Sequence, residues 1–174
     1  MSELVFRTAT LADVPALVAL VESAYRGDAS RQGWTTEADL LGGQRIDSAS
    51  LSETMSKPDS VVMIAERDQQ MLGCAHLERQ GTSAYFGMFA VVPTLQGGGV
   101  GAAILERCER YVRETWHCSA IRMSVIWSRN ELIAWYTRRG YAPTGERKPF
   151  PYGDARFGEP KRADLYFEVY AKAL

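Results

Sequence analysis

The chain has 174 residues, of which 46% are hydrophobic and 24% charged, and its formal net charge is −1 at pH 7. This length suits one domain with a sizeable core, so we expect residues 1–174 to form a single domain. The balanced composition excludes a disordered tail, and the near-neutral charge gives no support to a nucleic-acid or membrane-surface partner. No apolar run is long enough to span a membrane, and the N-terminus lacks a signal segment, which together predict a cytoplasmic protein.

Cysteine and histidine are scarce and are not arranged as metal ligands. The three cysteines, Cys74, Cys108 and Cys118, are odd in number and have no Cys-x-x-Cys spacing, which suits a reduced compartment. A zinc site needs about four ligands in paired spacing. We therefore predict no metal.

The first third of the chain predicts a strand, a helix and a polar stretch. Residues 4–9 are typical of a short strand, and residues 27–58 are polar and irregular, with a second helix around 50–58. Thr10 or Asp13 can cap the intervening helix. Its apolar side chains recur at helical spacing on one face: Val14, Leu17, Val18, Val21 and Tyr25.

The remaining elements alternate between strands and helices. Residues 60–66, 71–79 and 83–92 are β-rich, and short polar breaks between them suit hairpins. A long amphipathic helix after the glycines and a strand at 121–126 complete a βαβ unit, whose strands are parallel. A short helix follows with Asn130 at its N-cap and Gly140 at the C′ position, and residues 163–173 alternate as a half-buried strand.

Four glycines within five positions precede the long helix, in "PTLQGGGVGAAILERCERY" (93–111). Each costs roughly 0.5–1 kcal/mol relative to alanine inside regular structure. Backbone N–H groups without a neighbouring Cβ can close around a phosphate at a helix N-terminus, where the helix dipole adds positive charge. An ordinary βα connection needs no such run. We therefore predict a phosphate site here rather than a plain flexible loop.

Two common phosphate-binding loops do not match. A Walker loop needs Gly-Lys-Ser/Thr, and here Ala102 follows Gly101. A dinucleotide fingerprint fits loosely as Gly97-x-Gly99-x-x-Ala102, but the next strand lacks the acidic residue that binds the ribose.

The stretch "FAVVPTLQGGGVGAAIL" resembles the acyl-CoA-binding core of the GCN5-related N-acetyltransferase (GNAT) superfamily, whose pattern is Gln or Arg, two residues, Gly, one residue, Gly or Ala. Gln96, Gly99 and Gly101 fill these places. Further on, "RNELIAWYTRRGY" resembles the family's Asn-to-Tyr helix with its Gly-aromatic pair. Both motifs lie within residues 84–142. The resemblance implies the family's α/β fold: a mixed, mostly antiparallel central sheet with a parallel βαβ unit in the middle and helices on both faces.

The resemblance also implies acetyl-CoA as co-substrate. The backbone of Phe89, Ala90 and Val91 would pair with the pantetheine arm, and Asn130 would hydrogen-bond its amides. Arg138 or, in our assignment, Arg139 would reach the 3′-phosphate. From the residues alone, Asn130 is equally an N-cap, and the arginines equally complement a helix C-terminus. The pyrophosphate would be held by the loop: Gln96, Gly97, Gly98, Gly99, Val100, Gly101 and Ala102.

Tyr136 is the catalytic residue that the resemblance implies. A phenol with a pKa near 10 is protonated at pH 7 and can donate to a departing thiolate. Without the motif, Tyr136 is a core aromatic beside Trp135. The general base departs from the family pattern, because Met88 stands where several relatives carry Glu. Glu78, His76 or an ordered water are the alternatives.

The acceptor site is predicted between two loop regions, 26–47 and 147–164. Mixed charges there leave the acceptor open. Candidate contacts are Trp34, Arg45, Glu78, Phe150 and Tyr152. The leading hypothesis is an acetyl-CoA-dependent N-acetyltransferase of a small amine, monomeric or homodimeric. The alternatives are a non-catalytic acyl-CoA sensor or interaction module and a nicotinamide- or flavin-dependent oxidoreductase.

Overall fold

A seven-stranded mixed sheet forms the centre of the computed structural model, which describes residues 2–26, 33, 36–38, 40–42, 45–154 and 158–174. The strand order is β1-β3-β4-β5-β6-β9-β7. The strands are β1 (Val5–Thr8), β3 (Ser60–Arg67), β4 (Gln70–Gln80), β5 (Ser83–Val91), β6 (Ala120–Ile126), β7 (Ala142–Pro149) and β9 (Tyr166–Ala173). Only β5 and β6 pair in parallel, which confirms the predicted βαβ unit within a mostly antiparallel sheet.

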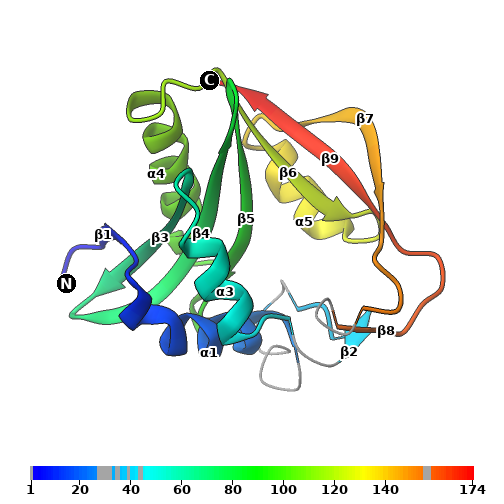
Figure 1. Ribbon diagram of the computed structural model, residues 1–174, viewed down its shortest axis with the longest axis horizontal. Helices are drawn as coiled ribbons and strands as arrows, with labels where there is room; N and C mark the ends of the chain where they lie inside the picture. Colours follow the sequence, from blue (N-terminus) through cyan, green and yellow to red (C-terminus); the bar gives the residue numbers. More distant parts are fainter. Residues whose placement is uncertain (1, 27–32, 34–35, 39, 43–44, 155–157) are drawn as a thin grey trace.

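Helices cover both faces of this sheet, as predicted (Figure 1). Neighbouring strand residues point to opposite faces, and Met63 and Ile64 of β3 belong to two different core clusters. Ile64 packs with α1 (Val14–Tyr25) and α3 (Ser48–Met55), whereas Met63 packs with α4 (Val100–Glu114). A fourth α-helix, α5 (Asn130–Thr137), contributes to the α4 cluster. The described residues therefore form one hydrophobic core on each face of the sheet, beside a smaller third cluster that contains Leu41, Ile126, Phe150 and Leu165.

Strands β5 and β6 pair over only three residues each and then separate. The pairs run from Ser83–Ala120 to Tyr85–Arg122. Figure 1 shows the two strands together at one end and diverging toward α1 and α5. Beyond Tyr85, one edge of β5 therefore has no partner among the described strands. An unpaired strand edge presents free backbone N–H and C=O groups to any extended ligand.

A β-bulge interrupts β5 along this free edge. His76 pairs with Gly87 and Cys74 pairs with Ala90. Two residues of β5, Met88 and Phe89, therefore lie opposite the single β4 residue between Cys74 and His76. Met88 has φ +48°, a left-handed conformation that is uncommon for a side chain of this size. Bulges of this kind redirect side chains and are frequent beside active sites.

Several predicted boundaries differ in detail. A 3₁₀ turn, η1 (Leu11–Asp13), precedes α1 and carries a capping box between Thr10 and Asp13. Asp13 is also the N-cap residue of α1, but its side chain makes no capping hydrogen bond to that helix. Arg129, not Asn130, is the N-cap of α5, so Asn130 is its first helical residue. Arg138 is the C-cap, so the C′ position is Arg139. Gly140, which was predicted at C′, lies one residue further on and has φ +97°.

Strand β7 and a second, smaller sheet were not predicted. Strand β7 was not expected from the sequence, because all eight of its residues are exposed and show no alternation. A small second sheet pairs β2 (Leu41–Gly42) with β8 (Glu159–Pro160). This pairing joins the two loop regions that the sequence placed around the acceptor.

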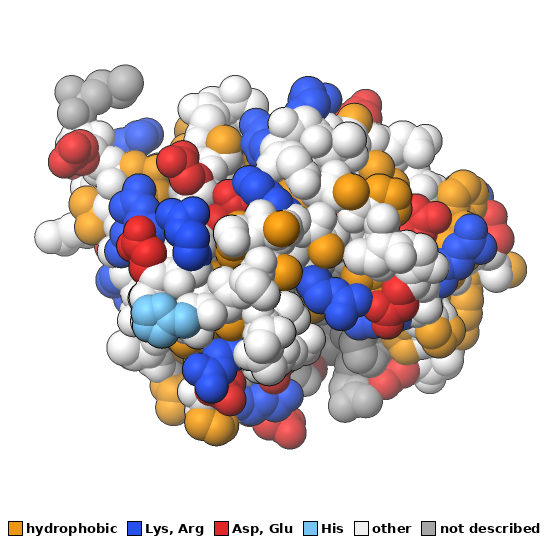
Figure 2. All heavy atoms as spheres, turned by 90° about the horizontal axis from the view of Figure 1, so that it is seen from above, with side chains coloured by type: hydrophobic (Ala, Val, Ile, Leu, Met, Phe, Trp, Pro, Cys, Tyr) orange, Lys and Arg blue, Asp and Glu red, His pale blue; other side chains and the backbone are white. Residues whose placement is uncertain are grey.

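The surface carries mixed charge. On the face shown in Figure 2, basic and acidic side chains are interspersed, and neither sign gathers into a continuous field. Among the described helices, none combines the length and the apolar character that crossing a bilayer requires.

Candidate active site

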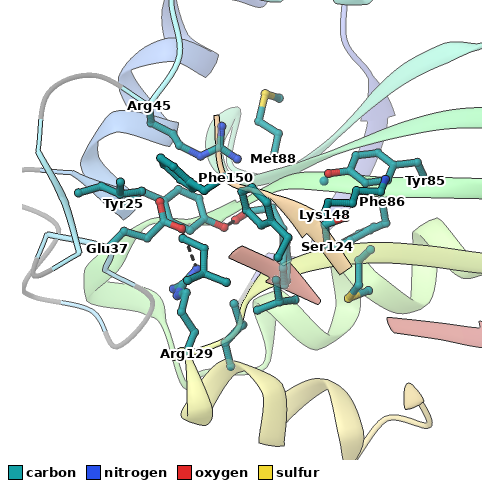
Figure 3. A pocket seen from close by; sticks show the side chains of 18 of the residues that line it. Tyr25, Glu37, Arg45, Tyr85, Phe86, Met88, Ser124, Arg129, Lys148 and Phe150 are labelled. Carbon is teal, nitrogen blue, oxygen red and sulfur yellow. Dashed lines mark hydrogen bonds and ion pairs between the residues drawn. The ribbon is translucent and has the colours of Figure 1, made fainter. Parts of the chain in front are cut away.

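A cavity of about 510 Å³ opens where β5 and β6 diverge (Figure 3). Its walls come from both diverging strands, from the end of α1, from α5 and from the chain that follows β7. Phe86, Met123 and Val125 contribute apolar surface from the strands, and Tyr136 contributes from α5. The splay of the parallel pair therefore creates a concave site in the middle of the sheet.

Tyr136 lies at the inner wall of this cavity, packed among other aromatic rings. Only 4% of the residue is exposed, and the rings of Trp135 and Tyr141 lie 5.3 and 5.7 Å from its own. Its hydroxyl makes no hydrogen bond with the described part of the chain. Burial raises the pKa of Tyr136 well above its ordinary value. The phenol therefore stays protonated at neutral pH, with its proton available to a ligand.

A second, smaller cavity of about 70 Å³ lies at the glycine loop. Gly97 and Gly99 have φ +88° and +89°, and a Cβ built at either would meet no atom within 4 Å. Gly99 is the N-cap of α4, and the first intrahelical bond runs from Ala103 N to Gly99 O. The N–H groups of the first helical turn thus lack intrahelical partners and point out of the helix end. Open backbone and free donors fit the predicted phosphate group.

The remaining loop residues have different environments. The Gly98 N–H donates to Leu95 O at 3.3 Å, so this amide closes the turn and is not free for a phosphate. The Val100 side chain is buried in the core. A Cβ on Gly101 would lie 3.3 Å from the Phe89 ring, so the missing side chain lets helix and strand approach closely. Gln96 spans the loop and donates from Nε2 to Val91 O at 3.1 Å.

The two cavities are adjacent. Phe89 and Leu132 line both of them. The glycine loop and Tyr136 therefore lie on adjoining surfaces, on either side of these shared wall residues. This arrangement matches the predicted path for a phosphate-bearing ligand with an extended arm.

The predicted backbone contacts on β5 are partly engaged already. The Tyr25 hydroxyl donates to the Phe89 carbonyl, and Gln96 donates to the Val91 carbonyl. Each carbonyl oxygen has a second lone pair, so an added strand can still pair with them. Ala90 is buried against α1 and lines neither cavity.

The two predicted side-chain contacts at α5 differ. Arg139 lines the glycine-loop cavity, where its guanidinium stacks 3.7 Å from the centre of the Trp135 ring and donates to Trp135 O. Asn130 is exposed at the start of α5 and is absent from the lining of both described cavities. Its contact with a pantetheine amide stays a prediction.

A buried ionic cluster of Glu37, Arg26 and Arg129 forms one end of the large cavity. Glu37 accepts from Arg26 at 3.0 Å and from Arg129 at 3.2 Å, and the three side chains are at most 9% exposed. Burial alone would raise the pKa of Glu37, but the charges of Arg129, Arg45 and Arg26 outweigh it and lower the pKa. Tyr25 stands beside this cluster, with the guanidinium carbons of Arg45 and Arg129 5.5 and 5.6 Å from its ring centre.

Three of the predicted acceptor residues line the large cavity: Arg45, Glu78 and Phe150. Tyr152 is absent from its lining, because its ring packs against Phe150 and its hydroxyl bridges Arg162 O and Leu165 N. Tyr152 thus supports the wall rather than forming it. Trp34 lies outside the described residues.

The candidate general bases differ in whether they line the large cavity. Glu78 lies on the cavity wall, with its carboxylate 3.7 Å from Lys57 Nζ. His76 is buried, shares a 2.7 Å hydrogen bond with Ser60 Oγ, and is absent from the lining of the described cavities. Burial lowers the pKa of His76, so it is neutral at pH 7. Met88 lines the cavity at the bulge and has no group that can accept a proton.

Nucleophilic thiols are not available at this site. All three cysteines are buried and reduced. Burial raises the pKa of Cys74 to about 12 and also raises that of Cys108. Within the described ranges, no group of three or more His, Cys, Asp and Glu side chains is placed to hold a metal ion.

Comparison with known proteins decides the family. The family model "Acetyltransferase (GNAT) domain" matches residues 26–150, which is most of the chain. The chain belongs to the GNAT acetyltransferase family. A protein described as "IAA acetyltransferase" from Azospirillum brasilense is 30% identical to this GNAT chain over 104 residues, which cover 58% of the chain and 65% of that protein. The match therefore spans just under two thirds of the relative's length.

Solved GNAT structures share the fold across nearly the whole chain. The ribosomal-protein-S18-alanine N-acetyltransferase from Escherichia coli superposes with a TM-score of 0.72 at 15% identity, over 98% of this chain and 94% of that one. An IAA acetyltransferase from Bacillus cereus gives a TM-score of 0.69 at 15% identity, over 99% and 100%. The predicted GNAT fold is thus confirmed.

Proposed function

We propose that this protein transfers the acetyl group of acetyl-CoA to the nitrogen of an amine by direct attack within a ternary complex. The observation that carries the proposal is the position of Tyr136, a protonated phenol in the wall of a cavity that adjoins the glycine-loop cavity. Relatives whose names describe an IAA acetyltransferase and a ribosomal-protein alanine N-acetyltransferase support acetyl transfer in general. Their names describe different substrates, so they do not indicate which acceptor this protein uses.

The chain's residues fit acetyl-CoA, which supplies an acetyl group activated as a thioester when bound. Gly97, Gly99 and the first N–H groups of α4 offer free donors and open space for the pyrophosphate. Arg139 lies at the same cavity and can meet a further phosphate. The unpaired edge of β5 offers backbone groups to the amides of the arm.

Tyr136 acts as the general acid in this mechanism. As the amine nitrogen bonds to the acetyl carbon, the bond from that carbon to sulfur breaks and its electron pair stays on sulfur. Tyr136 donates its phenolic proton to this sulfur and regains one from solvent, while the nitrogen releases one proton to solvent as the amide forms. Its raised pKa keeps the proton in place until the sulfur becomes basic.

Removal of the acceptor's own proton falls to water or to Glu78. Met88 cannot accept a proton, and His76 does not reach the described cavity walls. Glu78 does line the cavity, but its carboxylate is paired with Lys57. We assign the proton to water in contact with the open cavity, so the acceptor reacts as the neutral amine.

The test is thiol release in a single turnover, measured for wild type and Tyr136→Phe with a panel of amines. The variant should bind acetyl-CoA normally and react roughly 10²–10⁴-fold more slowly, the usual range for a lost general acid. Tyr141→Phe is the matched control, because it removes a hydroxyl from an adjoining ring whose partner is Glu109, away from the cavity. An equal rate in wild type and Tyr136→Phe would return Tyr136 to a packing role. If no amine releases thiol although acetyl-CoA stabilises the protein, the chain is a non-catalytic acyl-CoA binder.

A further inference from the structure

The walls of the large cavity carry more positive than negative charge. Arg26, Arg45, Arg129 and Lys148 line it, against Glu37 and Glu78. A strongly cationic acceptor would meet net repulsion in such a cavity, whereas an anionic group would be attracted. The excess of positive charge thus bears directly on what the cavity accepts.

Both carboxylates in the wall are already paired. Glu37 is held between Arg26 and Arg129, and Glu78 lies 3.7 Å from Lys57. Neither is therefore a free anchor for a cationic ligand. The pairing leaves positive charge uncompensated, and Arg45 carries part of it.

Arg45 has no carboxylate partner among the described residues. Its guanidinium stacks on the Tyr25 ring at 5.5 Å, and its side chain is half-buried. In Figure 3, Arg45 enters from one side of the cluster and Arg129, which is paired with Glu37, from the other. A guanidinium in this state offers a planar fork of N–H donors that matches the two oxygens of a carboxylate.

Hydrogen bonds to α1 hold the backbone at Arg45 in place. Glu22 of α1 accepts hydrogen bonds from the backbone N–H groups of both Arg45 and Ile46. The Tyr25 ring under the guanidinium is itself tied to β5 through the Phe89 carbonyl. The position of the free guanidinium is thus coupled to the strand that lines the proposed acetyl-transfer path.

One wall of the cavity is apolar. Phe150 stacks on Phe167 with ring centres 5.7 Å apart, and Leu41, Met88 and Ile126 complete this wall. Such surface suits a hydrocarbon or aromatic body rather than a chain of charges.

We propose that the acceptor amine carries a carboxylate on an apolar body, as an amino acid does, and that Arg45 binds this carboxylate. The inference rests on the proposed acetyltransferase function and names the acceptor class for that site. Arg129, held by Glu37, adds long-range positive charge to the same end of the cavity.

The experiment compares L-phenylalanine with L-phenylalaninamide and 2-phenylethylamine, and L-leucine with L-leucinamide, with spermidine as the polycation. The readout is kcat/KM for thiol release, with products identified by mass spectrometry. Each acid should exceed its amide by roughly 10–100-fold, the range for hydrogen bonds to charged groups. The less basic amine of the amide works against this result, so the comparison is stringent. Arg45→Gln should remove the preference, whereas Arg122→Gln, at an exposed arginine paired with Glu146, should keep it.

A binding measurement separates this proposal from acetyl transfer. 3-Phenylpropanoate has the body and the carboxylate but no amine, so its binding to the CoA-loaded protein by calorimetry reports carboxylate recognition without turnover. Binding that is lost in Arg45→Gln and weakened in Arg45→Lys supports the proposal even if no amine reacts, in which case the proposed function fails alone. Preference for the amides or spermidine, or no binding of 3-phenylpropanoate to wild type, overturns the proposal and leaves the acetyltransferase function standing.

Discussion

The buried Glu37 holds two arginines of the cavity wall by their charge. Replacing it with Gln leaves Arg26 and Arg129 facing each other without an anion. Removing one partner of a buried ion pair typically costs about 3–5 kcal/mol of unfolding free energy. We expect Glu37→Gln to lose stability in that range in urea denaturation at pH 7. Glu146→Gln, which breaks the exposed pair with Arg122, should change stability by less than about 1 kcal/mol.

The pH dependence of this loss has a fixed sign. The pKa of Glu37 is lowered in the folded state, because neighbouring guanidinium charges outweigh burial. Its stabilising contribution is therefore complete above the ordinary carboxyl pKa and is lost as the pH falls through the lowered folded value. The stability difference between wild type and Glu37→Gln should shrink on acidification. A difference that grows toward low pH would show that Glu37 is held as the neutral acid.

Because Met88 replaces the carboxylate that could act as a general base, we expect the reaction rate to depend on pH through the acceptor amine. A free alkyl ammonium near pKa 10 is about 0.1% neutral at pH 7, with lysine as the guide. For such an amine, kcat/KM should rise roughly tenfold per pH unit between about pH 6.5 and 8.5 and level off near the amine's own pKa. Glu78→Gln and His76→Asn should keep that slope. A plateau below about pH 7.5 that disappears in one of these variants would identify that residue as a protein base.

The glycine loop and α4 act as one element, because the helix start supplies the free donors and the glycines keep them accessible. Gly99→Val adds a β-branched side chain to the opening at φ +89°. Gly145 of β7 is the matched control, since it has φ +88° and equally open surroundings but lies far from the loop in the sheet order. Both valines strain the backbone alike, so both should lower the melting temperature by similar amounts.

Only Gly99→Val should lose the response to acetyl-CoA. A ligand at 100 times its Kd adds about 2.7 kcal/mol to the unfolding free energy, which a thermal shift detects readily. Wild type and Gly145→Val should show this stabilisation. A normal shift in Gly99→Val would place the phosphate site elsewhere, and a shift with NADPH or FAD in place of acetyl-CoA would favour an oxidoreductase.

The elements with strong apolar periodicity were predictable from the sequence. The helix that begins at Val100 and the strands β3 to β6 follow their patterns to within about two residues, because one face of each must be buried. Strand β7 was missed since it is an exposed edge strand with Pro143, Gly145 and Pro149, and its pairing with β9 carries it. The β2–β8 pair joins segments far apart in sequence, which no local pattern reveals.

The candidate site was predictable only where a local motif encodes it. The glycine loop, Tyr136 and Arg139 follow from two short motifs, and the structure brings them to adjoining cavities. Tyr25 was predicted only as an apolar helix residue, and no role was predicted for Arg129. Their roles depend on contact between α1, α5 and Glu37, which lie far apart in the chain. A charged residue in a loop gives no sequence signal of burial, so this cluster required the structure.

At the scale of the whole molecule, the two cavities adjoin each other. Phe89 and Leu132 border both, so co-substrate and acceptor can be present together. The buried cysteines have raised pKa values and offer no thiolate to carry an acetyl group. Under the proposed function, transfer is therefore expected to proceed directly from one ligand to the other, without an acetylated enzyme.

Initial-rate kinetics combined with intact-protein mass spectrometry test this claim most directly. Acetyl-CoA and an accepted amine are varied against each other, and the enzyme is quenched after incubation with acetyl-CoA alone. We predict intersecting double-reciprocal lines, no acetyl group on the enzyme, and thiol release only when the amine is present. Parallel lines together with an enzyme that gains one acetyl group before the amine is added would contradict direct transfer in a ternary complex.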